Sequence, residues 1–161
     1  MKNIIRSLVF SVFTLGVASV HADLIDNGSF ENPTAPSGSF TQFTGGTNIG
    51  GWTVVGTDTL LVHTAFMQNG ITFQLQDGNN WLDLSGATSN VLTNGVTQNA
   101  TTQIGTSYEL SFYVGSATDN SAFFASTVDL SIDGGGRQSF TNPTAPNNML
   151  NWMRFTVPFT A

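Results

Sequence analysis

The stretch DGNNWLDLSG, residues 77–86, shows in ten residues the pattern that decides the fold. Turn-forming Asp, Gly and Asn residues precede a short apolar run that favours β-structure, and a glycine follows it. The stretches LIDNGSFE, residues 24–31, and GGWTVVG, residues 50–56, combine the same two kinds of residue. Short strands between such turn signals predict an all-β fold.

Similar runs recur on both sides of these stretches. They cover residues 40–43, 60–62, 71–75, 96–101, 108–114, 126–132, 138–141 and 153–159. Apolar and polar residues alternate most clearly over residues 108–112 and 128–132, as in strands with one buried face. The sequence Asp133-Gly134-Gly135-Gly136 is typical of a hairpin turn. We therefore predict an antiparallel β-sandwich.

The first 22 residues have the features of an export signal of the bacterial type. Lys2 and Arg6 give a positive start, residues 7–17 are apolar but too few to span a bilayer, and Val20-His21-Ala22 suits cleavage. We predict a signal peptide over residues 1–22 and one β-sandwich domain over residues 23–161. The protein is then secreted or held at the cell surface, with no membrane insertion after cleavage.

The part that follows residue 22 is acidic and free of cysteine. It holds ten acidic residues against two basic ones, Arg137 and Arg154, which is a formal net charge of −8. Such a surface repels phosphate backbones and anionic membranes, so we expect no nucleic-acid partner. Without cysteine the fold has neither disulfides nor thiol chemistry.

Catalytic signatures are weak. His63 is the only histidine after residue 22, so no histidine metal cluster can form, and no nucleophile-elbow motif accompanies it. The pairs Asp77 with Asp83 and Asp129 with Asp133 do not single out a hydrolase, because Asp-Gly is ordinary turn chemistry. We predict no enzymatic activity and keep a carboxylate-dependent glycoside hydrolase as the remote alternative.

One tryptophan lies among side chains suited to a neutral sugar. An aromatic face covers the C–H side of a sugar, while amides and carboxylates bind its hydroxyl groups. The predicted ligand-binding residues are Trp81, Asp77, Asn79, Asn80 and Asp83. Trp52 follows two glycines and is expected to be buried, whereas Trp152 fits either a core or a surface position.

The ordered motifs NGSFE, SFTQFTGGTNIGGWTVVG, DGNNWLDLSG, VTQNATTQIGTSYELSFYVG and NMLNWMRFTVPFTA resemble the choice-of-anchor C family of exported bacterial proteins. They are also similar to the plant cell-wall family known as domain of unknown function 642. The resemblance covers nearly all of residues 23–161 and implies a galactose-binding-like jelly roll without catalytic activity. Because the chain stops at Ala161 within an apolar run, we expect a fragment that lacks its last strand or strands.

The resemblance also implies a structural calcium ion near the first strand. In related carbohydrate-binding modules the acidic residue of a motif like NGSFE is a ligand, which here is Glu31, and Asn27 could add an oxygen. Calcium needs about six to eight oxygen ligands. The alternative for Glu31 is an ordinary acid at a strand end.

Together these observations predict a secreted or cell-surface carbohydrate-binding or matrix-associated module without catalytic activity. Its partner would be a neutral polysaccharide or glycan, or another cell-surface component. The alternative is a structural or adhesive module that binds other proteins.

Overall fold

A computed structural model describes residues 24–64, 66–68, 70–87, 93–119, 122–123, 126–143 and 149–161, so the predicted signal peptide lies outside the described residues. The strands are β1 (Phe40–Thr44), β2 (Asn48–Ile49), β3 (Trp52–Val55), β4 (Asp58–His63), β5 (Met67–Gln68), β6 (Ile71–Thr72), β7 (Asn80–Asp83), β8 (Gly95–Thr97), β9 (Ser107–Ser116), β10 (Thr118–Asp119), β11 (Ala122–Phe123), β12 (Ser126–Leu130), β13 (Gln138–Asn142) and β14 (Asn151–Thr160). The described residues contain no helix able to cross a membrane.

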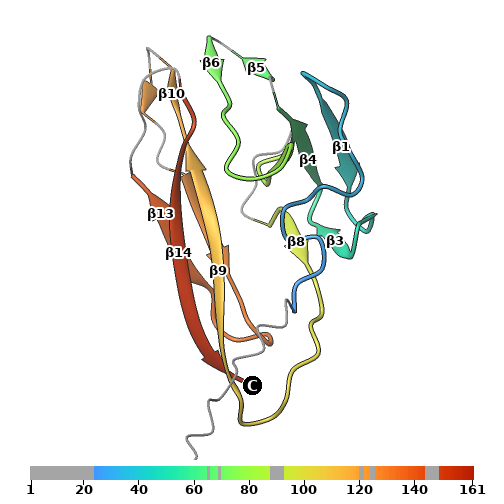
Figure 1. Ribbon diagram of the computed structural model, residues 1–161, viewed down its shortest axis with the longest axis vertical. Helices are drawn as coiled ribbons and strands as arrows, with labels where there is room; N and C mark the ends of the chain where they lie inside the picture. Colours follow the sequence, from blue (N-terminus) through green and yellow to red (C-terminus); the bar gives the residue numbers. More distant parts are fainter. Residues whose placement is uncertain are drawn as a thin grey trace, which may run out of the picture.

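The strands pair into antiparallel sheets on two sides of the molecule (Figure 1). The first half, residues 24–97, holds the three-stranded sheets β1-β4-β7 and β2-β3-β8. The second half, residues 107–161, holds the long β9–β14 pair and the β12–β13 hairpin. This arrangement confirms the all-β antiparallel class and fits a β-sandwich, while the jelly-roll strand order stays a prediction.

The second half follows the alternation seen in its sequence. β9 and β14 pair along their whole length, from Ser107 opposite Thr160 to Ser116 opposite Asn151. Their apolar faces meet the hairpin, because the ring of Phe140 on β13 lies 5.2 Å from that of Phe112 on β9 and 5.4 Å from that of Phe155 on β14, measured between centroids. Offset and edge-on ring pairs of this kind add to the burial energy.

The predicted hairpin turn between β12 and β13 is confirmed. Asp133 and Gly134 have φ angles of 52° and 69°, and the amide of Gly135 donates to the carbonyl of Ile132 at 2.9 Å. Two consecutive left-handed residues closed by this bond form a type I′ turn, whose twist matches that of antiparallel strands.

The most buried apolar side chains lie in the first half. Ile49, Val54, Leu61 and Val62 are each 1% exposed. β4 is the central strand of its sheet and is buried along almost all of its length. This explains why three consecutive apolar residues, Leu60, Leu61 and Val62, occupy its centre where a strand with one exposed face would alternate.

The register of the β1-β4-β7 sheet sorts its side chains onto two faces, because directly paired residues project to the same side. Phe40, Val62 and Trp81 are cross-strand partners on one face. Gln42, Leu60 and Asp83 form the next row on that face, which we call the Trp81 face. The opposite face carries, among others, the pair His63 and Asn80.

The first predicted strand runs are wrong at residues 24–31, which form turns. Asn27 and Phe30 have φ angles of 52° and 60°, in the left-handed region that a strand does not use. The Asn27 side chain closes the turn, since its Oδ1 accepts from the Asn32 amide at 3.0 Å and its Nδ2 donates to the Asn32 carbonyl at 2.6 Å.

Candidate functional site

Five aromatic side chains form a continuous series of ring contacts between the two halves. They are Phe40, Phe66, Phe73, Trp81 and Trp152, and we call this set the aromatic row. Successive ring centroids are 5.7, 5.5, 5.4 and 6.3 Å apart. The central pair, Phe73 and Trp81, is stacked with an interplanar angle of 18°.

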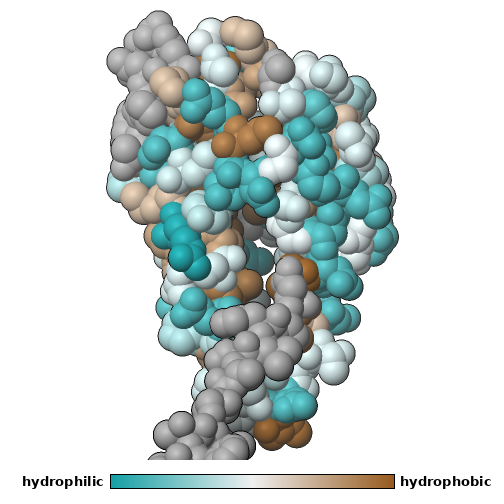
Figure 2. Space-filling view, viewed as in Figure 1, coloured by the Kyte–Doolittle hydropathy of each residue, from teal (hydrophilic) through white to brown (hydrophobic). Residues whose placement is uncertain are grey.

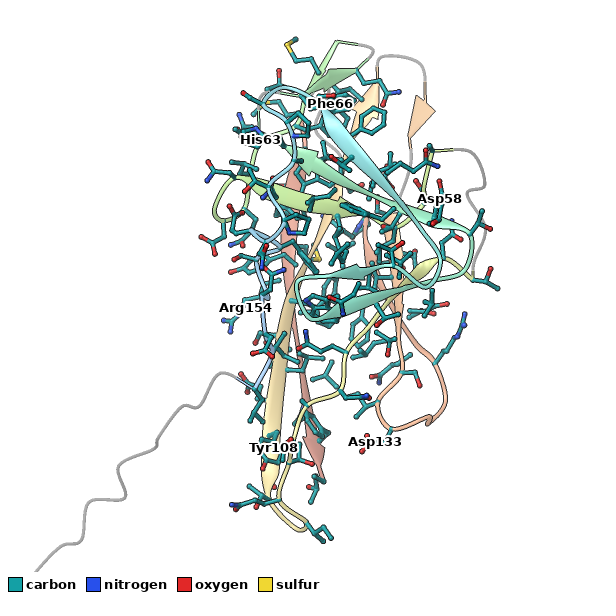
Figure 3. The ribbon with its side chains drawn as sticks, turned by 90° about the vertical axis from the view of Figure 1, so that its right-hand side faces the viewer. Asp58, His63, Phe66, Tyr108, Asp133 and Arg154 are labelled. Atoms are coloured by element: carbon teal, nitrogen blue, oxygen red, sulfur yellow. The ribbon has the colours of Figure 1, made fainter. Side chains whose placement is uncertain are left out.

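Several elements hold the row in place. Phe40 is on β1 and Trp81 on β7, on the same face of one sheet, and Trp152 reaches Trp81 from β14 in the second half. Phe66 and Phe73 lie directly before β5 and after β6, two short strands that pair with each other. Figure 3 shows Phe66 beside His63 at one end of β4, with Asp58 at the other end. The row therefore joins segments that are far apart in sequence.

The rings of the aromatic row are not fully covered by protein. Phe66, Phe73, Trp81 and Trp152 are partly exposed, and Phe40 is 40% exposed. The seam between the two halves is hollowed, with hydrophobic residues at its surface (Figure 2). Partly exposed aromatic side chains that contact one another across the two halves can bind an apolar ligand.

Asp83 brings a carboxylate to the same face as Trp81. The two residues are two positions apart on β7, so their Cα atoms are about 7 Å apart. Asp83 Oδ1 accepts from the Ser85 amide at 2.9 Å and from Ser85 Oγ at 2.5 Å. Oδ2 accepts no hydrogen bond from the described residues, so this oxygen can bind a group of a substrate.

A second carboxylate, Asp58, lies on this face but is only 1% exposed. Its Oδ2 accepts from Gln42 Nε2 at 2.6 Å and from the Ala87 amide at 2.9 Å, and Asn94 Nδ2 lies 3.5 Å from Oδ1. A side chain at Gly86 would collide with this carboxylate. Asp58 therefore fixes the segment that follows β7.

The five predicted ligand-binding residues lie on two faces of a sheet and in the turn before it. Trp81 and Asp83 share a face of the β1-β4-β7 sheet, whereas Asn80 projects to the opposite face, where its Nδ2 donates to the Phe30 carbonyl at 3.2 Å. Asp77 and Asn79 are exposed in the turn before β7. The strand alternation separates the set, because neighbouring residues of β7 point to opposite sides.

The two predicted calcium ligands bind different segments. Asn27 is occupied with Asn32, while Glu31 Oε1 accepts from the backbone amides of Asn79 and Asn80 at 2.8 and 2.9 Å. No group of three or more His, Cys, Asp or Glu side chains among the described residues could hold a metal ion. Glu31 and Asn27 alone do not supply the oxygens that calcium needs. The calcium ion stays a prediction.

The remaining single residues have structural surroundings. His63 lies on the face opposite Trp81, and its Nδ1 is 3.0 Å from the Thr64 carbonyl. Trp52 is partly buried, stacks at a tilt on Phe30 and donates from Nε1 to the Asn27 carbonyl at 3.2 Å. This supports the expected inward position of Trp52.

A scan against protein families matches the HpiC1-like family, described as HpiC1 cyclase, over residues 22–161. The chain belongs to this cyclase family. No curated protein and no solved structure matched the chain. The resemblance to the choice-of-anchor C family and to domain of unknown function 642 stays a prediction, because the match says nothing about either.

Membership of the cyclase family corrects the predicted function. The prediction of a carbohydrate-binding or matrix module without catalytic activity is wrong, because the matched family is one of enzymes. The same finding overturns the statement that the chain is not an enzyme. The error arose because aromatic residues between apolar strands were assigned to a core or to a sugar platform.

The sequence pattern identified two residues of the candidate site but not their partners. Trp81 and Asp83 were recognised from the motif at residues 77–86, and the structure places both on one face. Phe66, Phe73 and Trp152 were missed, because contacts between distant strands leave no local signal in a single sequence. The alternation of Trp81 and Asp83 with Leu82 was the one available sign that the two share a face.

Proposed function

We propose that this chain is the ring-closing part of an enzyme that cyclises a small, mainly apolar organic substrate at the aromatic row. Membership of the HpiC1-like cyclase family supports the reaction class. The observation that carries the location is the placement of Asp83 beside Trp81, on the face that meets Trp152 and Phe73. Apolar walls with one convergent polar group are the usual make-up of such sites.

The proposed reaction is an isomerisation. One route that closes a ring on an alkene without changing its formula delivers a proton at one carbon and removes another later. The first proton transfer leaves a carbocation, a second π bond attacks it to form the new carbon–carbon bond, and proton loss restores a neutral product. We assign both transfers to Asp83, because Asp58, the other carboxylate on this face, is 1% exposed and accepts hydrogen bonds from Gln42 and Ala87.

The aromatic row has two tasks in this mechanism. The π faces of Trp81 and Phe73 attract the positive charge of the intermediate, by about 0.5 to 2 kcal/mol for each favourable contact. The same rings exclude water, which would otherwise trap the cation as an alcohol.

The test is conversion of a panel of acyclic dienes that carry an aryl group. A cyclase of this kind gives a product of the same mass with one carbon–carbon double bond fewer, seen by mass spectrometry and by loss of alkene signals in the proton NMR spectrum. We expect D83N to lower turnover by about 10² to 10⁴-fold. Trp81→Ala should lower it by about three- to thirtyfold.

The matched control is D129N. Asp129 is an exposed carboxylate on β12 that accepts from Ser139 Oγ at 2.6 Å, far along the chain from the row. The D129N variant should therefore turn over the substrate at the wild-type rate. Equal turnover in D83N and the wild type, or a product that contains added water, would contradict the proposal.

We also propose that the protein is exported and begins at Asp23 after cleavage. The support is the charged start, the short apolar run and the Val20-His21-Ala22 site. Intact mass measurement of protein from the culture medium should give a chain that starts at Asp23. Finding only the full-length chain inside the cells would refute export.

A further inference from the structure

The three tryptophans differ in what their indole N–H groups bind. Trp52 Nε1 donates to the Asn27 carbonyl at 3.2 Å, and Trp152 Nε1 donates to the Gln74 carbonyl at 2.8 Å. Trp81 Nε1 is buried and has no hydrogen-bond partner among the described residues. The exception is the tryptophan at the centre of the candidate site.

An unpaired buried donor is costly. Leaving such a group without an acceptor costs about 1 to 3 kcal/mol, which is why the great majority of buried polar atoms are paired. Trp81→Phe would keep the aromatic stacking and avoid this cost. An acceptor atom on a bound ligand would remove this cost while keeping the indole in place.

Water is a poor candidate for that acceptor. A buried water molecule needs about two to four polar partners to be held. The rings of Phe73 and Trp152 and the cross-strand Val62 offer none, so a water molecule there would depend on the polar side chains of the next row on this face. Trp152 cannot supply a partner either, because its own N–H is bound to Gln74.

We propose that Trp81 Nε1 is the specificity-determining donor of the site, and that the substrate carries a neutral hydrogen-bond acceptor beside its apolar, ring-forming part. The inference rests on the proposed function and names the substrate class more closely. An anionic acceptor does not fit, because Asp83 and Asp58 lie on the same face and the chain after residue 22 is acidic. A carbonyl oxygen is the simplest group that meets these conditions.

Two probes of equal shape test the proposal on the wild-type protein. They are 2-acetylnaphthalene, which carries a carbonyl oxygen, and 2-isopropenylnaphthalene, which has a CH₂ group in its place. We expect the acetyl probe to bind about three- to tenfold more tightly, the usual worth of one neutral hydrogen bond. In ¹⁵N–¹H spectra it should move the indole N–H signal of Trp81 downfield and leave those of Trp52 and Trp152 in place.

Two conservative variants test whether the preference for the acetyl probe depends on Trp81. W81F keeps a ring against Phe73 and should bind both probes with equal affinity. W52F removes an indole N–H that is paired elsewhere, so it should keep the preference for the acetyl probe. Equal binding of both probes to the wild type, no binding of either probe, or an unchanged preference in W81F would overturn the inference.

The result of the probe-binding test can be distinguished from the result of the ring-closing assay. A preference for the acetyl probe that depends on Trp81 supports the donor role even if no diene is cyclised, in which case only the proposed reaction fails. Cyclisation that depends on Asp83, together with equal binding of the two probes, leaves the proposed function standing and refutes the donor role. The NMR shift needs no variant, so a folding defect in W81F would not block the test.

Discussion

The two halves of the molecule are stabilised in different ways. The first half has short strands joined by loops that buried or partly buried polar side chains tie to the backbone, as Asp58 does to residue 87 and Glu31 to residues 79 and 80. The second half depends on a ten-residue antiparallel pair and on the contact of Phe112 with Phe140 and Phe155. One buried polar side chain supplements this pairing, since Asn142 Nδ2 donates to the carbonyls of Val114 and Asn151 at 2.8 and 3.0 Å.

The difference affects where the candidate site can form. Irregular loops place residues of separate segments side by side, which is how Phe66 comes to contact Phe73, and Phe73 to contact Trp81. The regular pair contributes one ring, Trp152, from the end of β14. Functional groups gather on loops that a rigid scaffold positions. Removing a buried polar side chain should therefore lower the free energy of unfolding most in the first half. In the second half the largest loss should come from truncating an aromatic ring.

Removal of the Asp58 carboxylate should have the largest effect. Asp58→Ala leaves the donors of Gln42, Ala87 and Asn94 without this acceptor in a site that is 1% exposed. We expect a loss of about 3 kcal/mol in the free energy of unfolding, measured by urea denaturation. Asp129→Ala, the exposed counterpart on β12, should cost less than about 0.5 kcal/mol. Similar losses for the two would remove the contrast between the halves.

The second half should be most sensitive at the three-ring contact. Phe112→Ala removes the ring that touches both Phe140 and Phe155. Truncating a fully buried phenylalanine costs about 3 to 5 kcal/mol. Phe112 is only partly buried, so we expect a loss of about 2 kcal/mol in the free energy of unfolding. Tyr113, its neighbour on β9, is 41% exposed, and Tyr113→Ala should change the unfolding free energy by well under half as much. A larger loss at Tyr113 would show that the apolar face has been assigned to the wrong side.

Glu31→Gln tests whether the first half is held by hydrogen bonds or by an ion. The substitution weakens the charge-assisted bonds to the amides of Asn79 and Asn80, and we expect a cost of about 1 to 2 kcal/mol. If only hydrogen bonds are involved, thermal unfolding will show the same loss in calcium and in chelator. A calcium site at Glu31 would instead make the wild type more stable in calcium and make that gain disappear in the variant.

The contrast between the halves also explains what the sequence predicted well. In the second half, alternation and the Asp-Gly turn located β9, β12, β13 and the type I′ hairpin, because these features are local. In the first half β3 was placed correctly, but residues 24–31 were not, since nothing in the sequence marks a left-handed Phe30. The same limit applies to the candidate site. Trp81 and Asp83 lie within one motif, whereas the ring contacts that make Trp81 a site residue come from segments that only the folded chain brings together.

The smallest effect should come from the hairpin turn of the second half, where two glycines form a matched pair. Gly134 has a φ of 69°, and Gly136 has no left-handed φ; an added Cβ would meet nothing within 4 Å at either residue. The two positions therefore have equal room for a side chain and differ only in backbone conformation. Gly134→Ala should cost about 1 kcal/mol, because an L-residue is strained in the left-handed region. Gly136→Ala should be neutral or stabilise by up to about 1 kcal/mol, since it restricts the unfolded chain. Urea denaturation of both variants measures the difference, and equal effects would mean that β12 and β13 are held by their side chains instead of by the turn.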